Sequence, residues 1–346
     1  MTMRSFGIKS LAGFAALMLI MTACGDSDDS TAKAGTDETT TSAGDGGGKS
    51  PFDRAPKVRI MTIAPVNVGT WDPQHHKTYS EVAEEQGWDM EIAEAVPYGE
   101  AEQVLTQWGE DKVDVVFAPD SGFGEAVLKV APKYPDTVFA VMSALAPTDL
   151  ENVTSYAPDY CEMGYMAGAI GALSTESGEV GVVSGLPVPA VEQFFNGAEQ
   201  GVAATDDGVS IELAYSGDWV DAVKKAETAA GLVSGGADVI FSFDTVPTAT
   251  DQRVEKLGKN IIGIFADEKP FAPNAVITSV VINWQGYAET VEAVMNGKFE
   301  GSNHILGFQD GMLDVLPSGV AELDARIDEI KSQLENDEVK ISGECG

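Results

Sequence analysis

The chain has 346 residues, in which 55 Asp and Glu side chains outweigh 21 Lys and Arg side chains for a formal net charge of −34. So acidic a surface repels phosphate backbones and anionic lipid headgroups, which excludes nucleic acid as a partner and argues against direct adhesion to a membrane. Cysteine and histidine occur three times each, without the spacing of a metal site. We therefore expect neither a metal nor a cofactor.

Residues 1–23 have the layout of a secretory signal peptide. Arg4 and Lys9 supply the positive charge, the apolar run 11–21 follows, and small residues precede Cys24. The apolar run is shorter than the ~20 residues that span a bilayer, which disfavours a transmembrane helix. The sequence Thr22-Ala23-Cys24 resembles a bacterial lipobox, with Met21 where Leu is commonest. That resemblance implies lipidation of Cys24; an ordinary signal peptide with an incidental cysteine is the alternative.

The segment that follows reads as a tether. Residues 25–50 are mostly Gly, Ser, Thr and Asp and contain Gly46-Gly47-Gly48. Such a composition cannot bury enough apolar surface to fold. We expect residues 24–56 to connect a lipid anchor to a folded body that begins near Lys57.

Short apolar runs rich in β-branched residues alternate with helical patterns along the body. The expected strands are 58–63, 114–117, 137–141, 180–183, 211–215, 239–243 and 261–264. The expected helices include 80–86, 101–108, 123–130, 190–203 and 219–233. Alternation of this kind predicts an α/β fold with parallel sheets covered on both faces.

The pattern runs twice, which predicts two doubly wound, Rossmann-like lobes. Residues 108–117 and 233–241 both read as a helix end, a Gly turn, an Asp and a buried strand. Ligands of α/β proteins bind at the carboxyl ends of the strands. Two such lobes therefore predict a ligand cleft at the hinge between them, which closes by hinge motion.

Several motifs, in this order and spacing, carry a resemblance to one family. They are Gly122-Phe123-Gly124, residues 130–136, Asn152-Val153, residues 165–168, residues 178–185, Pro187-Val188-Pro189, Phe195-Asn196-Gly197, residues 236–240, Ile262-Gly263 with Asp267, Ala272-Pro273 and residues 278–281. The body resembles the basic membrane protein family of substrate-binding lipoproteins, which includes purine nucleoside receptors.

The resemblance implies the periplasmic-binding-protein type I fold, with three crossovers near 174–178, 276–284 and 298–305. It implies a first lobe of 57–175 plus 284–300 and a second lobe of 176–283 plus 301–346. Residues 321–334 would form a closing surface helix. The protein would be a monomeric, extracytoplasmic lipoprotein anchored to the cell membrane by Cys24, delivering a nucleoside to an ABC permease.

The same resemblance implies a set of ligand contacts. Trp71, expected in the loop after the first strand, and Trp219, expected to open a helix, would sandwich the base. Asp267, which follows a buried strand, would hold the ribose. Aromatic stacking and carboxylate hydrogen bonds suit those two parts of a nucleoside. Core packing for Trp219 and a turn cap for Asp267 are the alternatives.

Further candidates follow strand ends: Asn67, Asp72, Asp120, Ser121, Phe123 and Asp244. Phe123 is equally readable as core. Family members often carry Asp near position 68 and Lys near position 282, where this chain has Val68 and Ile282, with Asn67, Asp72 or Asn283 nearby as substitute contacts. These departures leave open a different cargo, such as a modified nucleoside, a free base or a sugar.

With Cys24 assigned to lipid, Cys161 and Cys345 remain, which permits one disulfide in an oxidising compartment. His75-His76 reads as a solvated pair at a helix start. Neither a G-x-S-x-G elbow nor a phosphate loop is present, so we expect no enzyme. A ligand-sensing lipoprotein that signals to a membrane partner would use the same lobes and stays open as an alternative.

Overall fold

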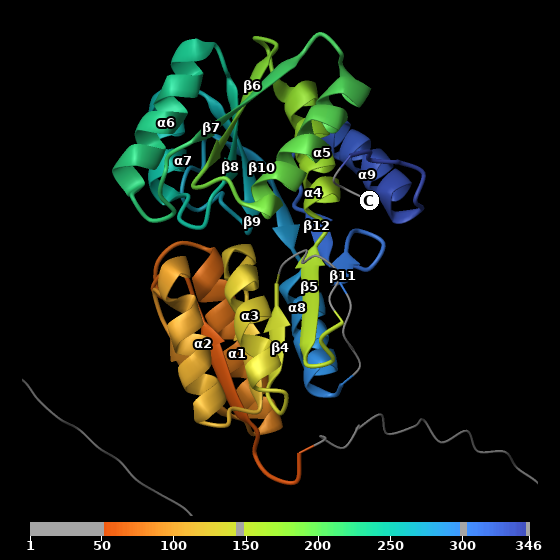
Figure 1. Cartoon of the computed structure of the whole chain (residues 1–346). Helices are drawn as coiled ribbons and strands as arrows, with labels where there is room; N and C mark the ends of the chain where they lie inside the picture. Colours follow the sequence, from red (N-terminus) through yellow and green to blue (C-terminus); the bar gives the residue numbers. More distant parts are fainter. Residues whose placement is uncertain (1–51, 143–148, 298–302, 344–346) are drawn as a thin grey trace, which may run out of the picture. The chain divides into compact units, whose positions relative to one another are not determined.

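Two sheets of six strands organise the body of the chain (Figure 1). A computed structural model describes residues 52–142, 149–297 and 303–343. The signal peptide, Cys24 and most of the tether lie outside these residues. Within the described ranges no helix is both long enough and apolar enough to cross a membrane.

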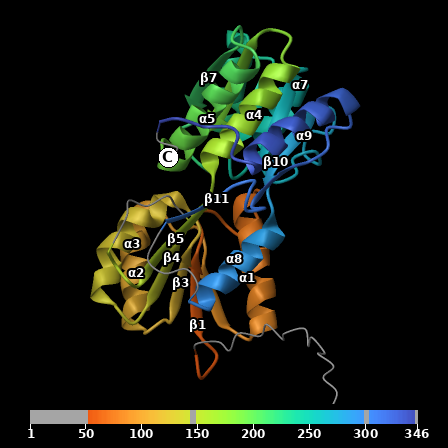
Figure 2. The same cartoon turned by 90° about the vertical axis from the view of Figure 1, so that its right-hand side faces the viewer.

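The sheet of lobe 1 is parallel throughout and has the order β11-β5-β4-β3-β1-β2. Its strands are β1 (Lys57–Met61), β2 (Asp89–Ala93), β3 (Val115–Ala118), β4 (Val138–Val141), β5 (Val153–Pro158) and β11 (Asn303–Leu306). Helices α1 (Trp71–Gln86) and α8 (Trp284–Met295) cover one face, and α2 (Ala101–Glu110) and α3 (Gly124–Val130) cover the other (Figure 2). Short 3-10 turns occupy Tyr98–Glu100, Ser121–Phe123 and Ala131–Lys133.

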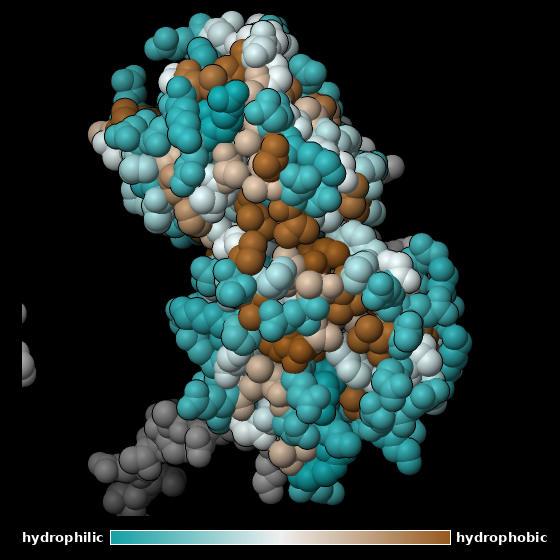
Figure 3. All heavy atoms as spheres, turned by 90° about the vertical axis from the view of Figure 1, so that its left-hand side faces the viewer, coloured by the Kyte–Doolittle hydropathy of each residue, from teal (hydrophilic) through white to brown (hydrophobic). Residues whose placement is uncertain are grey.

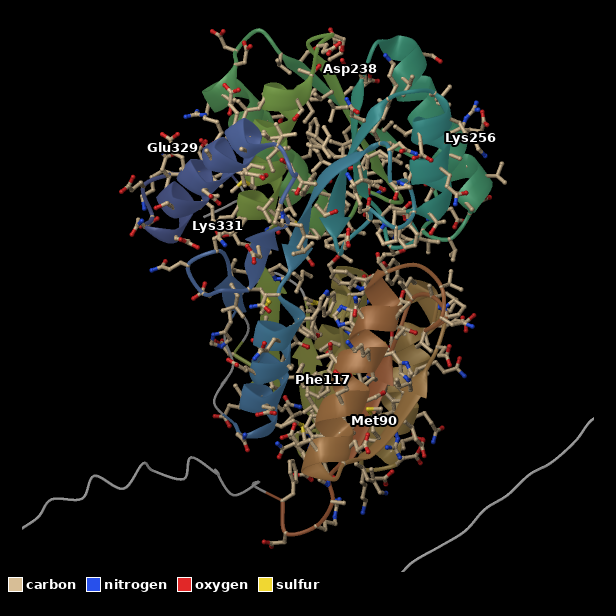
Figure 4. All side chains as sticks on the ribbon, turned by 180° about the vertical axis from the view of Figure 1, so that it is seen from behind. Met90, Phe117, Asp238, Lys256, Glu329 and Lys331 are labelled. Atoms are coloured by element: carbon tan, nitrogen blue, oxygen red, sulfur yellow. The ribbon has the colours of Figure 1, made fainter. Side chains whose placement is uncertain are left out.

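Both faces of this sheet are buried beneath helices, as the continuously apolar strand sequences predict. In β3, Phe117 points to the core beneath α1 and α8, whereas Val116 belongs to the core beneath α2 and α3. Figure 4 marks Phe117 inside this lobe. Both side chains are fully buried, because successive residues of a strand face opposite sides. Sandwiching between helices therefore explains why the strand is continuously apolar.

The sheet of lobe 2 has the order β12-β10-β9-β8-β6-β7, with only β12 antiparallel to its neighbour among the described strands. Its strands are β6 (Glu179–Ser184), β7 (Ser210–Tyr215), β8 (Val239–Phe243), β9 (Asn260–Phe265), β10 (Val276–Ile282) and β12 (Leu313–Val315). Its helices are α4 (Tyr160–Ser174), α5 (Pro189–Thr205), α6 (Ala222–Gly235), α7 (Thr248–Lys256) and α9 (Ala321–Glu335).

Helices α4 and α5 form the tightest helix pair of lobe 2, because glycines of each helix face backbone carbonyl groups of the other. A Cβ on Gly168 would lie 2.2 Å from the carbonyl oxygen of Ala198, and a Cβ on Gly197 would lie 2.1 Å from that of Cys161. Only glycine permits backbones to approach so closely. The motifs at 165–168 and 195–197 are thus packing motifs of one helix pair.

The expected α/β fold with two doubly wound lobes is confirmed, and the helix expected at 321–334 is α9. The first crossover was placed wrongly at 174–178. Because α4 packs on α5 and on the strands of lobe 2, the chain crosses between β5 and Tyr160. The lobe 1 range 57–175 is therefore too long.

The third crossover was also placed too early. Strand β11 pairs in parallel with β5, with Asn303 opposite Ser155 and Leu306 opposite Pro158, so these residues belong to lobe 1. The chain enters lobe 2 only after Leu306, and β12 then pairs with β10. Residues 301–346 are therefore not wholly in lobe 2. The middle crossover runs from β10, which ends at Ile282, into α8.

Side-chain caps mark the places where the chain turns from a crossover into a helix. Asp159 accepts hydrogen bonds from the backbone N–H groups of Cys161 and Glu162 at the start of α4, both at 2.9 Å. Asn283 caps α8 in the same way through the backbone N–H groups of Gln285 and Gly286. Such caps satisfy the free N–H groups of a first helical turn. Asn283, which the sequence offered as a substitute ligand contact, is thereby explained as a cap.

Candidate functional site

A small cavity lies where strand ends and helix starts of both lobes meet. Lobe 1 contributes the start of α1 and the loop after β3, and lobe 2 contributes the starts of α4 and α5, the loop before α6 and the ends of β8 and β9. The lining residues are Trp71, Asp120, Ser121, Tyr160, Val188, Ala190, Trp219, Phe243, Thr245 and Phe265. This is the carboxyl edge of both parallel sheets, where α/β folds bind ligands.

The cavity is small. Its volume is about 30 Å³, close to that of one water molecule and far below the roughly 300 Å³ at which ligand pockets begin. Figure 3 shows apolar side chains gathered in the band where the lobes meet. A ligand larger than water therefore enters only when these walls separate.

Aromatic side chains make up half of the lining residues. Trp71 is 4 % exposed, and its indole N–H donates to the carbonyl of Pro119 at 3.0 Å. Its ring meets that of Phe265 edge to face, with centroids 4.7 Å apart, and Phe265 meets Phe243 at the same distance. Trp219 lies flat against Gly185, where a Cβ would come within 2.3 Å of the indole. The walls thus bring aromatic rings from both lobes to the same cavity.

Asp120 is the charged side chain in the lining. Its Oδ1 accepts from the Tyr98 hydroxyl and from the Gly122 backbone N–H, both at 2.8 Å. Burial raises the pKa of Asp120 to about 6, and these two hydrogen bonds act against the rise. Asp120 is therefore an anchored acceptor whose charge depends on pH close to neutrality.

Asp72 and Asp244 lie behind the walls rather than in them. Asp72 follows Trp71 in the first turn of α1 and is 1 % exposed; burial and the charge of Asp120 raise its pKa to about 8. Asp244 is fully buried, and its Oδ1 accepts from the Lys225 ammonium at 2.7 Å. Neither carboxylate lines the cavity.

The structure also separates other expected contacts from the cavity. Phe123 is fully buried in the core of lobe 1, where it packs edge to face on Tyr98. Asn67 and Asp267 are exposed. Phe265, two residues before Asp267, has a φ of 78°, and the chain turns there. After this turn Glu268 is buried, whereas Asp267 faces outward and its Oδ1 accepts from the backbone N–H of Lys269. The ribose role expected for Asp267 thus finds no support in this arrangement.

The expectation that His75 and His76 form a solvated pair is wrong for His75. Its ring is fully buried, with centroids 4.6 Å from Trp71 and 5.0 Å from both Trp284 and Tyr287. Burial lowers the pKa of His75 to about 3, so the imidazole is neutral. Helix α1 begins at Trp71 rather than at Ser80. His75 therefore lies within the helix, on the face that is buried.

Sequence reasoning missed Tyr160, Thr245 and Phe265. Phe265 and Thr245 lie at or just after the ends of buried strands, the same signal that led to Asp120 and Asp244. Tyr160 carried no such signal, because it opens a helix whose lobe was misassigned. Among described residues no group of three or more His, Cys, Asp or Glu side chains is placed to hold a metal ion.

Cys161 is disulfide-bonded. Its expected partner, Cys345, lies outside the described residues, as does Cys24. The last described residues reach this helix pair: the Ser342 carbonyl accepts from Asn196 Nδ2 at 2.8 Å and from Gln200 Nε2 at 3.0 Å. The pairing of Cys161 with Cys345 stays a prediction.

Comparison with known proteins gives a consistent match over the folded body. The chain is 27% identical over 303 residues to a purine-binding protein of Brucella abortus, covering 86% of this chain and 84% of that one. It is 28% identical over 344 residues to a Haloferax volcanii protein named for glucose binding, covering 97% and 87%. A solute-binding protein structure of an ABC transporter system from Aeropyrum pernix superposes with a TM-score of 0.74 at 19% identity, covering 83% of this chain and 93% of that one.

The family model described as "ABC transporter substrate-binding protein PnrA-like" matches residues 57–344, which span both sheets and every wall of the cavity. Proteins of this class work outside the cytoplasm. The chain belongs to the Bmp family of PnrA-like ABC transporter substrate-binding proteins.

Proposed function

We propose that this substrate-binding protein captures a purine, as a nucleoside or a free base, between its lobes and delivers it to an ABC permease. The observation that carries the proposal is the position of Trp71 in lobe 1 and Trp219 in lobe 2 on the same cavity. Bases stack on aromatic side chains irrespective of sequence, since each base has a π-face. A Brucella relative named for purine binding supports the same ligand class.

Polar groups in the walls suit a nitrogen heterocycle. Asp120, Ser121 and Thr245, together with the hydroxyl of Tyr160, supply polar groups among the lining residues. An ionised Asp120 accepts ring or exocyclic N–H groups, and its orientation is already set by Tyr98. Asp267 faces away from the cavity. The cavity would therefore hold the base, and a ribose would need contacts other than Asp267.

A sugar is the second candidate, favoured by the Haloferax relative named for glucose binding. A hexose presents several hydroxyls, each of which needs a hydrogen-bond partner when buried. The few polar side chains of the lining satisfy such a ligand less completely than a flat ring. Aromatic walls therefore favour the purine.

The test is isothermal titration of the chain from residue 51 onward with adenine, guanine, adenosine, guanosine, uridine and glucose. Saturable binding of a purine compound with no response to glucose is the expected result. Binding of glucose alone would overturn the ligand and keep the family. Native mass spectrometry of the freshly purified protein gives a parallel answer from any co-purified ligand.

The lipid anchor is a second part of the proposal. Residues 1–23 would be removed, Cys24 would carry the lipid, and residues 24–56 would tether the body. Cys24→Ser should release the protein from the membrane fraction into the soluble extracytoplasmic fraction, with unchanged ligand affinity. Membrane retention of that variant would contradict the anchor. Light scattering of the soluble body should give the mass of a monomer.

A further inference from the structure

Lys225 is the fully buried lysine of lobe 2, and its ammonium joins two loops. Its Nζ donates to Asp244 Oδ1 at 2.7 Å, to the Trp219 carbonyl at 2.9 Å and to the Val246 carbonyl at 3.0 Å. Three N–H groups thus meet three acceptors, the full capacity of a lysine. Lys225 sits in the first turn of α6, which Asp221 caps.

The first loop carries the tryptophan wall. Trp219 precedes α6, and apart from Lys225 its carbonyl accepts only from the Thr245 hydroxyl, at 3.3 Å, among the hydrogen bonds of the described residues. Within the described residues the Trp219 indole N–H makes no hydrogen bond of ordinary geometry, and the Tyr98 hydroxyl is the polar group that interacts with it. The position of the Trp219 side chain therefore depends on the hydrogen bonds to its backbone carbonyl and on its packing against Gly185.

The second loop carries the contact between the lobes. Asp244 Oδ1 also accepts from the Val246 backbone N–H at 2.9 Å, which closes a tight turn around Thr245. Thr245 lines the cavity, and its carbonyl accepts from the Thr70 backbone N–H of lobe 1 at 2.9 Å. A single ammonium thus reaches both the cavity wall and the turn that meets the other lobe.

Stability alone explains this arrangement poorly. Replacing a buried ion pair by apolar residues of similar size is often neutral or stabilising, because the charges lose their hydration. Burial indeed raises the pKa of Asp244, and the Lys225 charge acts against that rise. A leucine or methionine would fill the space but would remove one donor from each of the two carbonyls and from the carboxylate.

We propose that Lys225 is a positioning residue for ligand binding, which holds the Trp219 wall and the Thr245 turn in one fixed arrangement. It touches no ligand itself, since it does not line the cavity. Its effect on affinity rests on the proposed function, whereas its effect on the position of Trp219 does not.

The test compares Lys225→Met combined with Asp244→Asn, which removes both charges at nearly constant volume, with Lys225→Arg. Lys256→Met is the matched control, because Lys256 is exposed at the outer end of α7 (Figure 4). Each protein is labelled with 5-fluorotryptophan, and Trp219→Phe identifies the Trp219 signal among the five tryptophans. Fluorine spectra without ligand report the Trp219 environment, and titration with the best-bound purine reports affinity.

We expect the double variant and Lys225→Arg to fold, to shift or broaden the Trp219 signal, and to lose at least tenfold in affinity, while Lys256→Met matches the wild type. An unmoved Trp219 signal with affinity within twofold of the wild type would overturn the proposal. Failure of both variants to fold would assign Lys225 to stability and overturn it equally. If the wild type binds no purine, the proposed function is wrong. The fluorine spectra of the wild type and the variants would still show whether Lys225 positions Trp219.

Discussion

The backbone N–H of Thr70 donates to the carbonyl of Thr245 at 2.9 Å, and this hydrogen bond joins lobe 1 directly to lobe 2. The residue before Thr70 is Gly69, whose φ is 80° and whose missing Cβ would lie 2.0 Å from the same carbonyl oxygen. Glycine therefore does two things here: it adopts the left-handed backbone, and it leaves room for the other lobe.

Gly69→Ala should block closure. The added methyl group collides with the Thr245 carbonyl, so the lobes cannot reach the contact seen here, and we expect at least a tenfold loss of ligand affinity. Gly87→Ala is the control, because Gly87 has a similar φ of 71° but open space around its Cβ position. Both variants pay the backbone strain of about 1 kcal/mol; only Gly69→Ala should lose affinity by titration. Equal affinity in the two variants would contradict the role of this contact.

Trp219→Ala should cost about 1–3 kcal/mol of binding free energy, the usual contribution of one stacked base. Trp71→Ala should cost a similar amount from the opposite wall. Trp108→Ala serves as the control, since Trp108 lies on α2 outside the cavity lining. Calorimetry of the folded variants measures the effect, and unchanged affinity after Trp219→Ala would remove stacking from the mechanism.

Asp72→Asn should stabilise the protein at pH 8 more than at pH 5. The carboxyl pKa is about 8 in the fold against 3.8 in the unfolded chain, because burial and the Asp120 charge disfavour ionisation. The folded state therefore binds more protons than the unfolded state, and stability falls as pH rises from about 4 to 8. At the limit this ionisation costs about 6 kcal/mol.

Thermal melts of the ligand-free wild type and Asp72→Asn across pH 5 to 8.5 measure that effect. The difference between their midpoints should grow steadily with pH. Because the amide of Asn does not titrate, a difference that is the same at every pH would show that Asp72 ionises normally in the fold.

The disulfide prediction concerns the C-terminal tail, which Asn196 and Gln200 hold beside α5 through Ser342. Cys161 is bonded there, and peptide mapping without reduction should recover it linked to Cys345. Cys161→Ser should lower stability by about 3–5 kcal/mol, because a long closed loop restricts the unfolded chain. Cys24→Ser should leave the unfolding midpoint unchanged. Alkylation of Cys345 in the native, unreduced protein would show that the pairing is wrong.

Local sequence was enough to predict β1, β3 and β4 of lobe 1 and β6, β7, β8 and β9 of lobe 2. The apolar run at 239–243 is β8 to the residue, and 261–264 lies within β9, because a strand buried on both faces must be continuously apolar. Helix α1 was shortened in prediction because its first turns, from Trp71 to Tyr79, mix buried aromatics with polar residues such as Asp72 and His75. No local pattern shows that such polar groups are buried.

The sequence by itself determined the two doubly wound lobes, because these depend on periodicity, and the resemblance to the family pointed to Trp71 and Trp219, which both line the cavity. Tertiary structure alone decided which lobe holds α4, since that depends on glycines of α4 and α5 packing against backbone carbonyl groups of the opposite helix. It also decided that Asp267 faces outward while Phe265 joins the wall, and that Lys225 ties Trp219 to Asp244. These outcomes rest on side chains and backbones that are distant in the chain, and only packing brings them together.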